Sequence, residues 1–312
     1  MARFKQDPSR TLTLRDKFSA EAYQRMRRLK GLIRKALVEQ DVLALNTNAP
    51  SYGAAPGEKA FDFPRTDTKV QGFMEWLRRQ EEDGILQIEQ GDPSLPAISD
   101  HWAGTYVRRG YVQGVSRAQQ QLKKEGMQIT PIEEQTGMTG EPQPLGTAIS
   151  MSAPMHADRL GLVWTRTFNE LKGITEAMDQ QISRELAEGM ALGENPYTIA
   201  RRLNDRVDKI GITRSRLLAR TEVIRAHAEA QLSEYERQGV EEAIGDVEFS
   251  TAGDSRVCPR CKALQGREFT TQEARGLIPV HPRCRCAWIP VIRDEAGQPI
   301  GQGAAAKQKQ VS

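Results

Sequence analysis

The chain has 312 residues, of which 38% are hydrophobic and 27% charged, and its formal net charge at pH 7 is +3. The mean hydropathy of −0.58 and the lack of any apolar run of eighteen residues exclude a membrane-spanning protein, and the length allows two soluble domains. The first residues lack the apolar core of a signal peptide, so we expect the protein to reside in a cytoplasm-like compartment.

Positive charge gathers in two segments. Residues 1–40 hold eleven Lys and Arg against four Asp and Glu, and residues 254–293 hold eight against three. Either segment can meet a polyanion, although a solvated basic face is the commoner meaning of such a pattern.

The first predicted helix begins near Ser19 and runs toward Leu45, within an N-terminal basic helix or arm at residues 1–45. Its apolar face carries Tyr23, Met26, Ile33 and Leu37. We interpret it as a helix with one core face and a solvated basic back, rather than one that docks onto nucleic acid. Residues 46–57, rich in Asn, Pro, Ser and Gly, break the pattern.

Residues 46–125 are predicted to form the first part of a helical domain. One helix follows a cap at Thr66 and ends at Gly84, and its buried face is predicted to hold Val70, Phe73, Met74 and Leu77. The next starts after Asp100, and His101 at its start is interpreted as a surface or capping residue. Glycine inside a helix costs about 1 kcal/mol relative to alanine. Gly110 and Gly114 therefore predict a face that another helix approaches closely.

Residues 126–155 lose periodicity and collect Pro, Gly and Met, which predicts a linker or extended arm. Helical periodicity returns at His156, and residues 156–240 form the second part of the helical domain. Caps are predicted at Asn195, before a proline, and at Thr213, with a stop at Gly239. His227 has no second histidine or cysteine one turn away, so it is interpreted as a core or surface residue and not as a metal ligand.

All four cysteines and one of the four histidines lie between Cys258 and Cys286. A Cys-x-x-Cys pair followed by a His-x-x-Cys pair has the ligand types and spacing of a tetrahedral zinc site. The predicted ligands are Cys258, Cys261, His281 and Cys284. Cys286 is the alternative, because residues two apart in an extended segment point to opposite faces. Soft ligands favour Zn²⁺, and the lack of an open coordination position favours a structural ion.

Free thiols beside a loop histidine, or two disulfides, are the alternatives for this cluster. Strand-like stretches at 246–250 and 287–292 and a turn at 264–269 surround it, so residues 241–294 predict a small β/zinc-binding module. A module of this size buries little core, and the ion would supply folding energy. The predicted fold class is therefore α+β and mostly α-helical: a helical body, this module, and a flexible tail at 295–312.

Three stretches resemble the phage head morphogenesis family, the Mu F-like minor head proteins. They are RTEVIRA from Arg220 to Ala226, the CPxC pattern at Cys258, and PVHPRCR from Pro279 to Arg285. The resemblance covers residues 60–292 and is strongest from residue 195 onward. The metal-binding positions of the family match Cys258, Cys261, His281 and Cys284, whereas the family does not require Cys286.

The resemblance implies a non-enzymatic minor capsid protein of a tailed bacteriophage. It would lie inside the head at the portal vertex, assemble from the host cytoplasm, and act in head assembly and in DNA packaging or ejection. Its implied partners are the portal protein, the major capsid or scaffolding protein, and phage DNA bound without sequence specificity. No membrane partner is implied. We take the arginines around the cluster as candidate DNA contacts: Arg256, Arg260, Arg283 and Arg285.

Three other classes of protein share part of this pattern. A His-Asn-His nuclease needs a catalytic histidine besides a metal-binding one, and only His281 lies in this module. A Cys-His protease or transferase needs a third group to orient the histidine, and none is evident. A sequence-independent nucleic-acid-binding zinc protein remains the alternative function.

Overall fold

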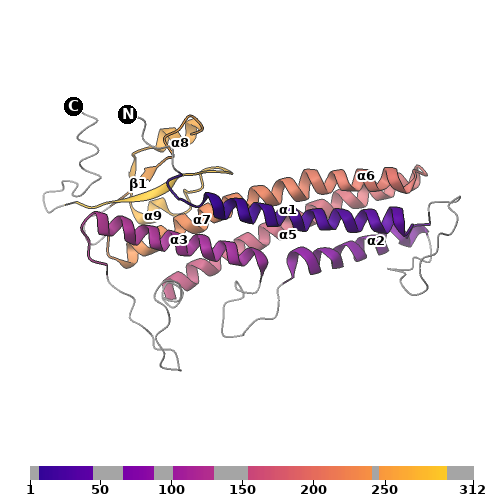
Figure 1. Cartoon of the computed structure of the whole chain (residues 1–312), viewed down its shortest axis with the longest axis horizontal. Helices are drawn as coiled ribbons and strands as arrows, with labels where there is room; N and C mark the ends of the chain where they lie inside the picture. The colour runs from indigo at the N-terminus through magenta and orange to yellow at the C-terminus, as the bar shows by residue number, and fades with distance from the viewer. Residues whose placement is uncertain (1–6, 45–65, 88–100, 130–153, 241–245, 294–312) are drawn as a thin grey trace, which may run out of the picture. The chain divides into compact units, whose positions relative to one another are not determined.

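A computed structural model describes residues 7–44, 66–87, 101–129, 154–240 and 246–293 (Figure 1). The helices are α1 (Leu12–Arg34), α2 (Thr66–Glu81), α3 (Trp102–Lys124), α5 (Pro154–Ala191), α6 (Pro196–Arg206), α7 (Thr213–Arg237), α8 (Pro259–Leu264) and α9 (Thr271–Ala274). Within these residues, π-helical segments extend three of the helices: η1 (Lys35–Glu39), η2 (Glu82–Leu86) and η4 (Val207–Ile212). The strands are β1 (Asp246–Ser250), β2 (Glu268–Phe269) and β3 (Ala287–Val291).

This architecture confirms the predicted fold class, a helical body followed by a small β module. Within the described ranges, none of the helices combines the length and hydropathy of a membrane span. The predicted arm at 126–155 and the predicted tail at 295–312 fall almost wholly outside the described residues.

The chain divides into two compact units. Unit 1 comprises Met1–Lys17, Gly91–Arg166 and Arg220–Ser312, and unit 2 comprises Phe18–Gln90 and Thr167–Ala219. The boundaries between the units fall inside α1, α5 and α7. The domain bounds expected from the sequence stay a prediction.

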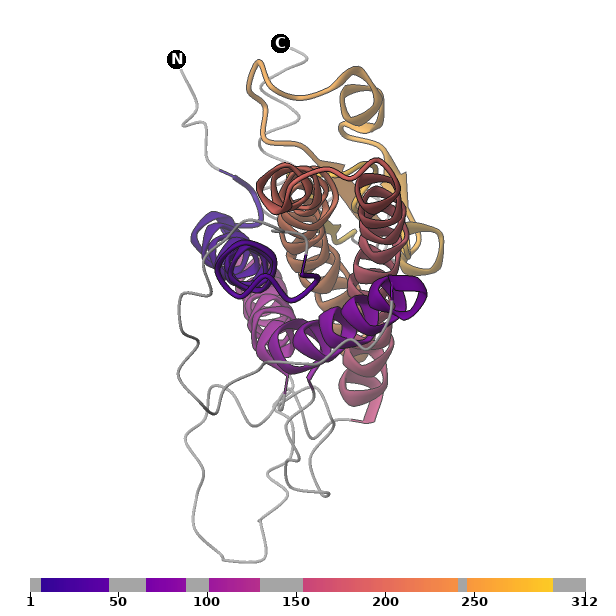
Figure 2. The same ribbon diagram turned by 90° about the vertical axis from the view of Figure 1, so that its right-hand side faces the viewer.

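Unit 2 is a bundle of helices, seen nearly end-on in Figure 2. Apolar residues at helical spacing face its interior, as predicted for α2, where Phe73, Met74 and Leu77 are buried. Val70 is only half-buried. Close packing also involves Gly211, where an added Cβ would lie 3.0 Å from the sulfur atoms of Met26 and Met178.

Two predicted helix starts were wrong. The first helix begins at Leu12 instead of near Ser19, because Leu14 and Phe18 extend the buried stripe toward the N-terminus by about two turns. Thr213 does not cap a new helix, since the chain is helical from Pro196 through η4 into α7. Its hydroxyl donates to the carbonyl of Asp208 at 2.9 Å, which a residue inside a continuous helix can do.

The close helix approach predicted at Gly110 and Gly114 is confirmed in unit 1. A Cβ on Gly110 would lie 3.2 Å from the carbonyl oxygen of Val223 in α7, and one on Gly114 would lie 2.3 Å from that of His227. Of the two interpretations of His101, the capping role is confirmed: its Nδ1 accepts a hydrogen bond from the Ala103 amide at 3.1 Å. The two glycines thus let α3 and α7 pack backbone against backbone.

The sheet in unit 1 is antiparallel with strand order β2-β1-β3. Val247 and Phe249 of β1 alternate toward a core that Trp288 of β3 completes. The same core includes Leu122 of α3 and Leu232 of α7. The β module therefore has no separate interior, since it shares one core with these two helices.

A buried polar network fixes the free edge of β3. The Gln231 side chain donates to the Trp288 carbonyl at 3.0 Å and accepts from the Trp288 amide at 3.3 Å. Gln121 also donates to that carbonyl at 3.0 Å, and Tyr235 donates to the Gln121 side-chain oxygen at 2.8 Å. Because β3 pairs only with β1 among the described strands, these side chains supply the hydrogen bonds that a further strand would make.

Candidate metal centre

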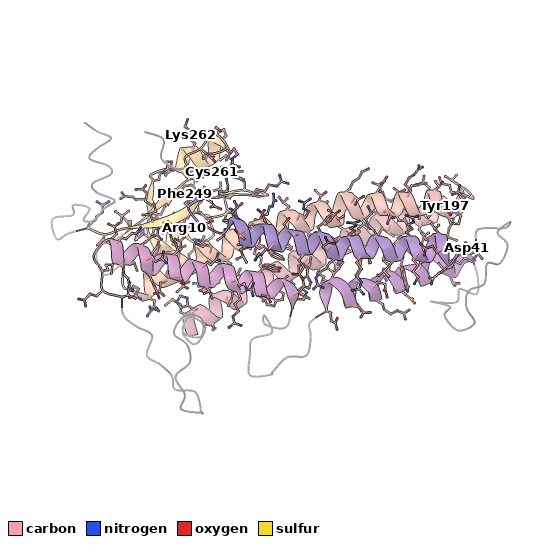
Figure 3. All side chains as sticks on the ribbon, viewed as in Figure 1. Arg10, Asp41, Tyr197, Phe249, Cys261 and Lys262 are labelled. Atoms are coloured by element: carbon pink, nitrogen blue, oxygen red, sulfur yellow. The ribbon has the colours of Figure 1, made fainter. Side chains whose placement is uncertain are left out.

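Cys258 and Cys261 are positioned by the short helix α8. Cys258 is the N-cap residue and Pro259 occupies the first turn, a position where proline loses no helical hydrogen bond. The Cys258 sulfur accepts from the Cys261 amide at 3.4 Å, and this bond lowers the pKa of the Cys258 thiol. Figure 3 labels Cys261 and Lys262 on this helix, where Cys261 is buried and Lys262 exposed. The tight turn expected for the Cys-x-x-Cys pair is therefore a capped helix start.

His281 and Cys284 sit on a turn ahead of β3. The Cys284 amide donates to the His281 carbonyl at 3.1 Å, and Arg283 between them has a φ of 64°. His281 Nδ1 lies 2.7 Å from the Pro282 carbonyl oxygen, which can only accept, so Nδ1 carries the proton. The Nε2 lone pair of a neutral His281 is then available as a ligand, which is how metal-binding histidines are commonly oriented.

Four other candidate ligand atoms lie around the Cys261 sulfur. His281 Nε2 lies 3.2 Å from it and the Cys284 sulfur 3.9 Å. Tetrahedral Zn–S bonds of about 2.3 Å separate two sulfur atoms by about 3.8 Å, so the Cys261–Cys284 distance fits a shared zinc ion. Cys258, Cys261 and His281 form one group with ligand atoms within 4.8 Å of one another. Cys261, Cys284 and Cys286 form a second.

The reason given for setting Cys286 aside was wrong. An extended segment would point Cys284 and Cys286 to opposite faces, yet their sulfur atoms lie within 4.8 Å of each other. The segment is still leaving the turn at Arg283, and regular strand begins only at Ala287. Both thiols therefore reach the same cluster, and either can provide the fourth ligand.

The buried thiols share protons unequally. Hydrogen bonding from Cys286 lowers the pKa of the Cys284 thiol to about 5, and the same contact raises the pKa of Cys286. Burial raises the pKa of Cys261 to about 12. A divalent cation would replace the retained protons with a charge that the sulfur atoms bind directly, so metal binding here releases protons.

The four arginines proposed as DNA contacts differ in their ion pairing and exposure. Arg285 forms a two-pronged ion pair with Asp254, at 2.7 and 2.6 Å. This pair is the main cause that lowers the pKa of Asp254, and Arg256 donates to the same carboxylate from its amide and its guanidinium group. Arg260 and Arg283 are exposed. Arg285 thus anchors the loop that precedes the cluster, Arg256 is exposed but paired with the same Asp254, and Arg260 and Arg283 present charge to solvent.

Sequence reasoning missed the residues that support this cluster. Asp254 aligns Arg285, and Thr221 of α7 accepts a bond from the Arg283 amide at 3.4 Å. The latter contact joins the RTEVIRA stretch to the HPRCR stretch. The signal that could have found it is the co-occurrence of these two stretches.

The comparisons with known proteins give one finding. Residues 180–289 match the family described as Phage Mu protein F like protein. The matched span runs from the end of α5 through α6 and α7 into β3, and it includes the whole Cys/His cluster. The comparisons with curated proteins and with solved structures each give no match.

Proposed function

Because residues 180–289 match the family described as Phage Mu protein F like protein, we propose that the chain is a structural minor head protein of a tailed bacteriophage. The family indicates phage head morphogenesis and a place in the virion. The finer proposal is a position at the portal vertex inside the head, with a role in head assembly and in DNA packaging or ejection. Its partners there are the portal protein and the major capsid or scaffolding protein.

The observation that supports this proposal best is that the matched region packs as one structural unit. The cluster at Cys261 lies in one core with α3 and α7, and Thr221 connects the two family-like stretches. Buried thiols, a capped helix start and an anchored arginine favour a rigid structural part over a site of turnover. We assign no catalytic role to these residues.

We infer that Cys258, Cys261, His281 and Cys284 hold a structural Zn²⁺, with Cys286 as the alternative to Cys284. The ion would supply a cross-link between α8 and the turn before β3, and so contribute to folding. The residues themselves contribute the preset tautomer of His281 and the capped geometry of Cys258. Because Cys261 and Cys284 are buried, water is excluded from the side of the candidate metal site that faces the core.

Exposed Arg256, Arg260 and Arg283 support weak DNA contact without base recognition. Scattered guanidinium groups neutralise phosphates but present no element to base edges. We propose that portal docking instead depends on apolar surface, so the two interactions should respond differently to salt.

A pull-down of the full chain against portal protein and against DNA at rising salt tests the proposal. Replacing Arg256, Arg260 and Arg283 together by Gln should flatten the salt dependence of DNA binding and leave portal binding unchanged. Arg214→Gln, at an exposed position of α7, is the matched control. Loss of portal binding at moderate salt, with tight DNA binding that persists whatever the DNA sequence, would favour the sequence-independent nucleic-acid-binding zinc protein instead.

A further inference from the structure

Unit 2 carries a surface groove between α6 and the end of the first helix. Its volume is about 440 Å³, and two rows of side chains spaced four residues apart line it. One row lies on α1 and η1 and the other on α6, which packs against η1. Residues four apart on a helix lie on one side of it, so each row borders the groove along its length. The rows are Lys30, Arg34 and Val38, and Tyr197, Arg201 and Asp205.

The base of the groove is apolar. Ala200 lines it and is only 3% exposed, and the half-buried Val38 lies across from it on η1. Because alanine has a short side chain, it leaves room between the two helices that a larger residue would fill. The groove therefore combines apolar contact at its base with charged groups along its borders.

Two guanidinium groups in the groove lack a counter-charge. Arg34 and Arg201 are exposed, and neither forms an ion pair with a carboxylate in the described part of the chain. Arg202, the next residue of α6, is by contrast bonded to glutamates of α5 and of the turn that follows it. Lys30 is paired with Asp208 at 2.5 Å, yet an ammonium group has three donors and can bind a second carboxylate.

Tyr197 holds a large ring in water at the border of the groove (Figure 3). Its exposure is 65%, and that of Leu192, in the turn that joins α5 to α6, is 67%. Side chains fix this turn, since Asn195 caps α6 and Arg202 bonds Glu194 at 3.0 Å. The ring is thus presented on an ordered backbone and adds little to the core. Tyrosine and arginine are the residue types that dominate binding energy at protein interfaces.

We propose that this groove binds an acidic segment of a partner protein, in which an apolar side chain lies close to the carboxylates. The apolar side chain would cover the base of the groove beside the Tyr197 ring. The carboxylates would pair with Arg34 and Arg201, whose planar guanidinium groups can each donate two parallel hydrogen bonds to one carboxylate. This inference goes beyond the role in the phage head and does not depend on it.

Nucleic acid is the other kind of polyanion that two unpaired arginines attract. Asp205 places a negative charge in the lining, which repels an evenly charged phosphate backbone. A peptide can instead place its few carboxylates on the arginines and away from Asp205. The apolar base likewise gives contacts that phosphate groups do not use. Charge complementarity therefore favours an acidic peptide segment.

Selection of short random peptides on the full chain tests the proposal. Peptides enriched on the parent should carry carboxylates next to an aromatic or aliphatic residue, and they should not be enriched on the double variant Arg34→Glu/Arg201→Glu. Arg184→Glu, at an exposed position of α5 outside the groove, is the matched control and should select the same peptides as the parent. Equal urea midpoints would show that the exposed substitutions leave the fold intact.

Fluorescence anisotropy with one selected peptide separates the contributions. Its affinity should fall about tenfold or more for Tyr197→Ala, the effect of removing an interface anchor. Arg34→Gln and Arg201→Gln should each weaken it about two- to fivefold, as expected for exposed ion pairs, and added salt should weaken it further.

The proposal is overturned if the parent enriches no acidic peptides, or if the double variant binds the selected peptides as tightly as the parent. A single-stranded oligonucleotide whose binding requires Arg34 and Arg201, with no acidic peptide enriched, would assign the groove to nucleic acid and equally overturn it.

Discussion

Alanine substitution at three helix glycines tests the close packing of α3 on α7. Gly161, in the part of α5 that belongs to unit 1, has no atom within 4 Å of an added Cβ, so Gly161→Ala should gain about 1 kcal/mol from helix propensity. At Gly110 the added Cβ would meet the Val223 carbonyl at 3.2 Å, a contact that yields by a few tenths of an ångström. Gly110→Ala should therefore be nearly neutral.

Gly114→Ala should be destabilising. Its Cβ would lie 2.3 Å from the His227 carbonyl oxygen and 2.7 Å from the Ala230 Cβ, whereas ordinary contacts begin at 3.4 Å. The obstacle is helix backbone, so α3 and α7 would have to separate. Overpacking of this kind costs about 3 kcal/mol, which the propensity gain of about 1 kcal/mol reduces to a net loss of about 2 kcal/mol. Gly114→Leu should lose more.

Urea unfolding followed by tryptophan fluorescence measures the series. Trp102, Trp164 and Trp288 lie in unit 1, so the signal reports mainly on the unit that carries the substitutions. The expected order of stability is Gly161→Ala, then Gly110→Ala, then Gly114→Ala. A Gly114→Ala variant as stable as Gly161→Ala would refute the close approach.

Three other outcomes are expected. Burial and the neighbouring Asp179 raise the pKa of Glu81 to about 9 from 4.5, so the fold favours its protonated form and loses stability as pH rises from 4.5 toward 9. Urea midpoints at pH 5.5, 7 and 8.5 should fall less steeply for Glu81→Gln; an unchanged slope would contradict this. The purified chain should carry about one zinc by elemental analysis. Cys258→Ser should lower that content and Cys286→Ser should not, whereas metal-free protein with a protease-resistant C-terminus would exclude a structural ion. Gln231→Ala should cost about 1–3 kcal/mol because it leaves the Trp288 amide buried without a partner, whereas Gln121 still donates to the Trp288 carbonyl. Exposed Gln120→Ala serves as its control in the same denaturation assay, and equal midpoints for the two variants would show that the network contributes nothing.

Local patterns were sufficient to predict most helices and the Cys/His cluster. Helical spacing identified buried residues such as Met178 and Ile182 because one face of each helix packs inward. The Asn195 cap was readable because its side chain bonds the Thr198 amide three residues on. Signals of this kind depend on residues near one another in sequence.

Features that depend on distant residues were not predicted. Gln121 and Gln231 meet 110 residues apart in sequence, and no periodicity marks a glutamine that will be fully buried. The predicted helix start at Thr213 was wrong although a local signal was present. Thr213 is a good capping residue, but the chain is already helical before it.

The glutamine bonded to β3 also bears on how this protein behaves at high concentration. An unpaired strand edge can recruit a strand from another copy, which leads to domain swapping or fibres. With the Gln231 amide bound to Trp288, that route along β3 is closed without any additional strand. The opposite edge is β2, a two-residue strand that is too short to template pairing with another chain. At high concentration, copies of this chain can therefore contact one another through helix surfaces without pairing of their sheet edges, which would lead to aggregation.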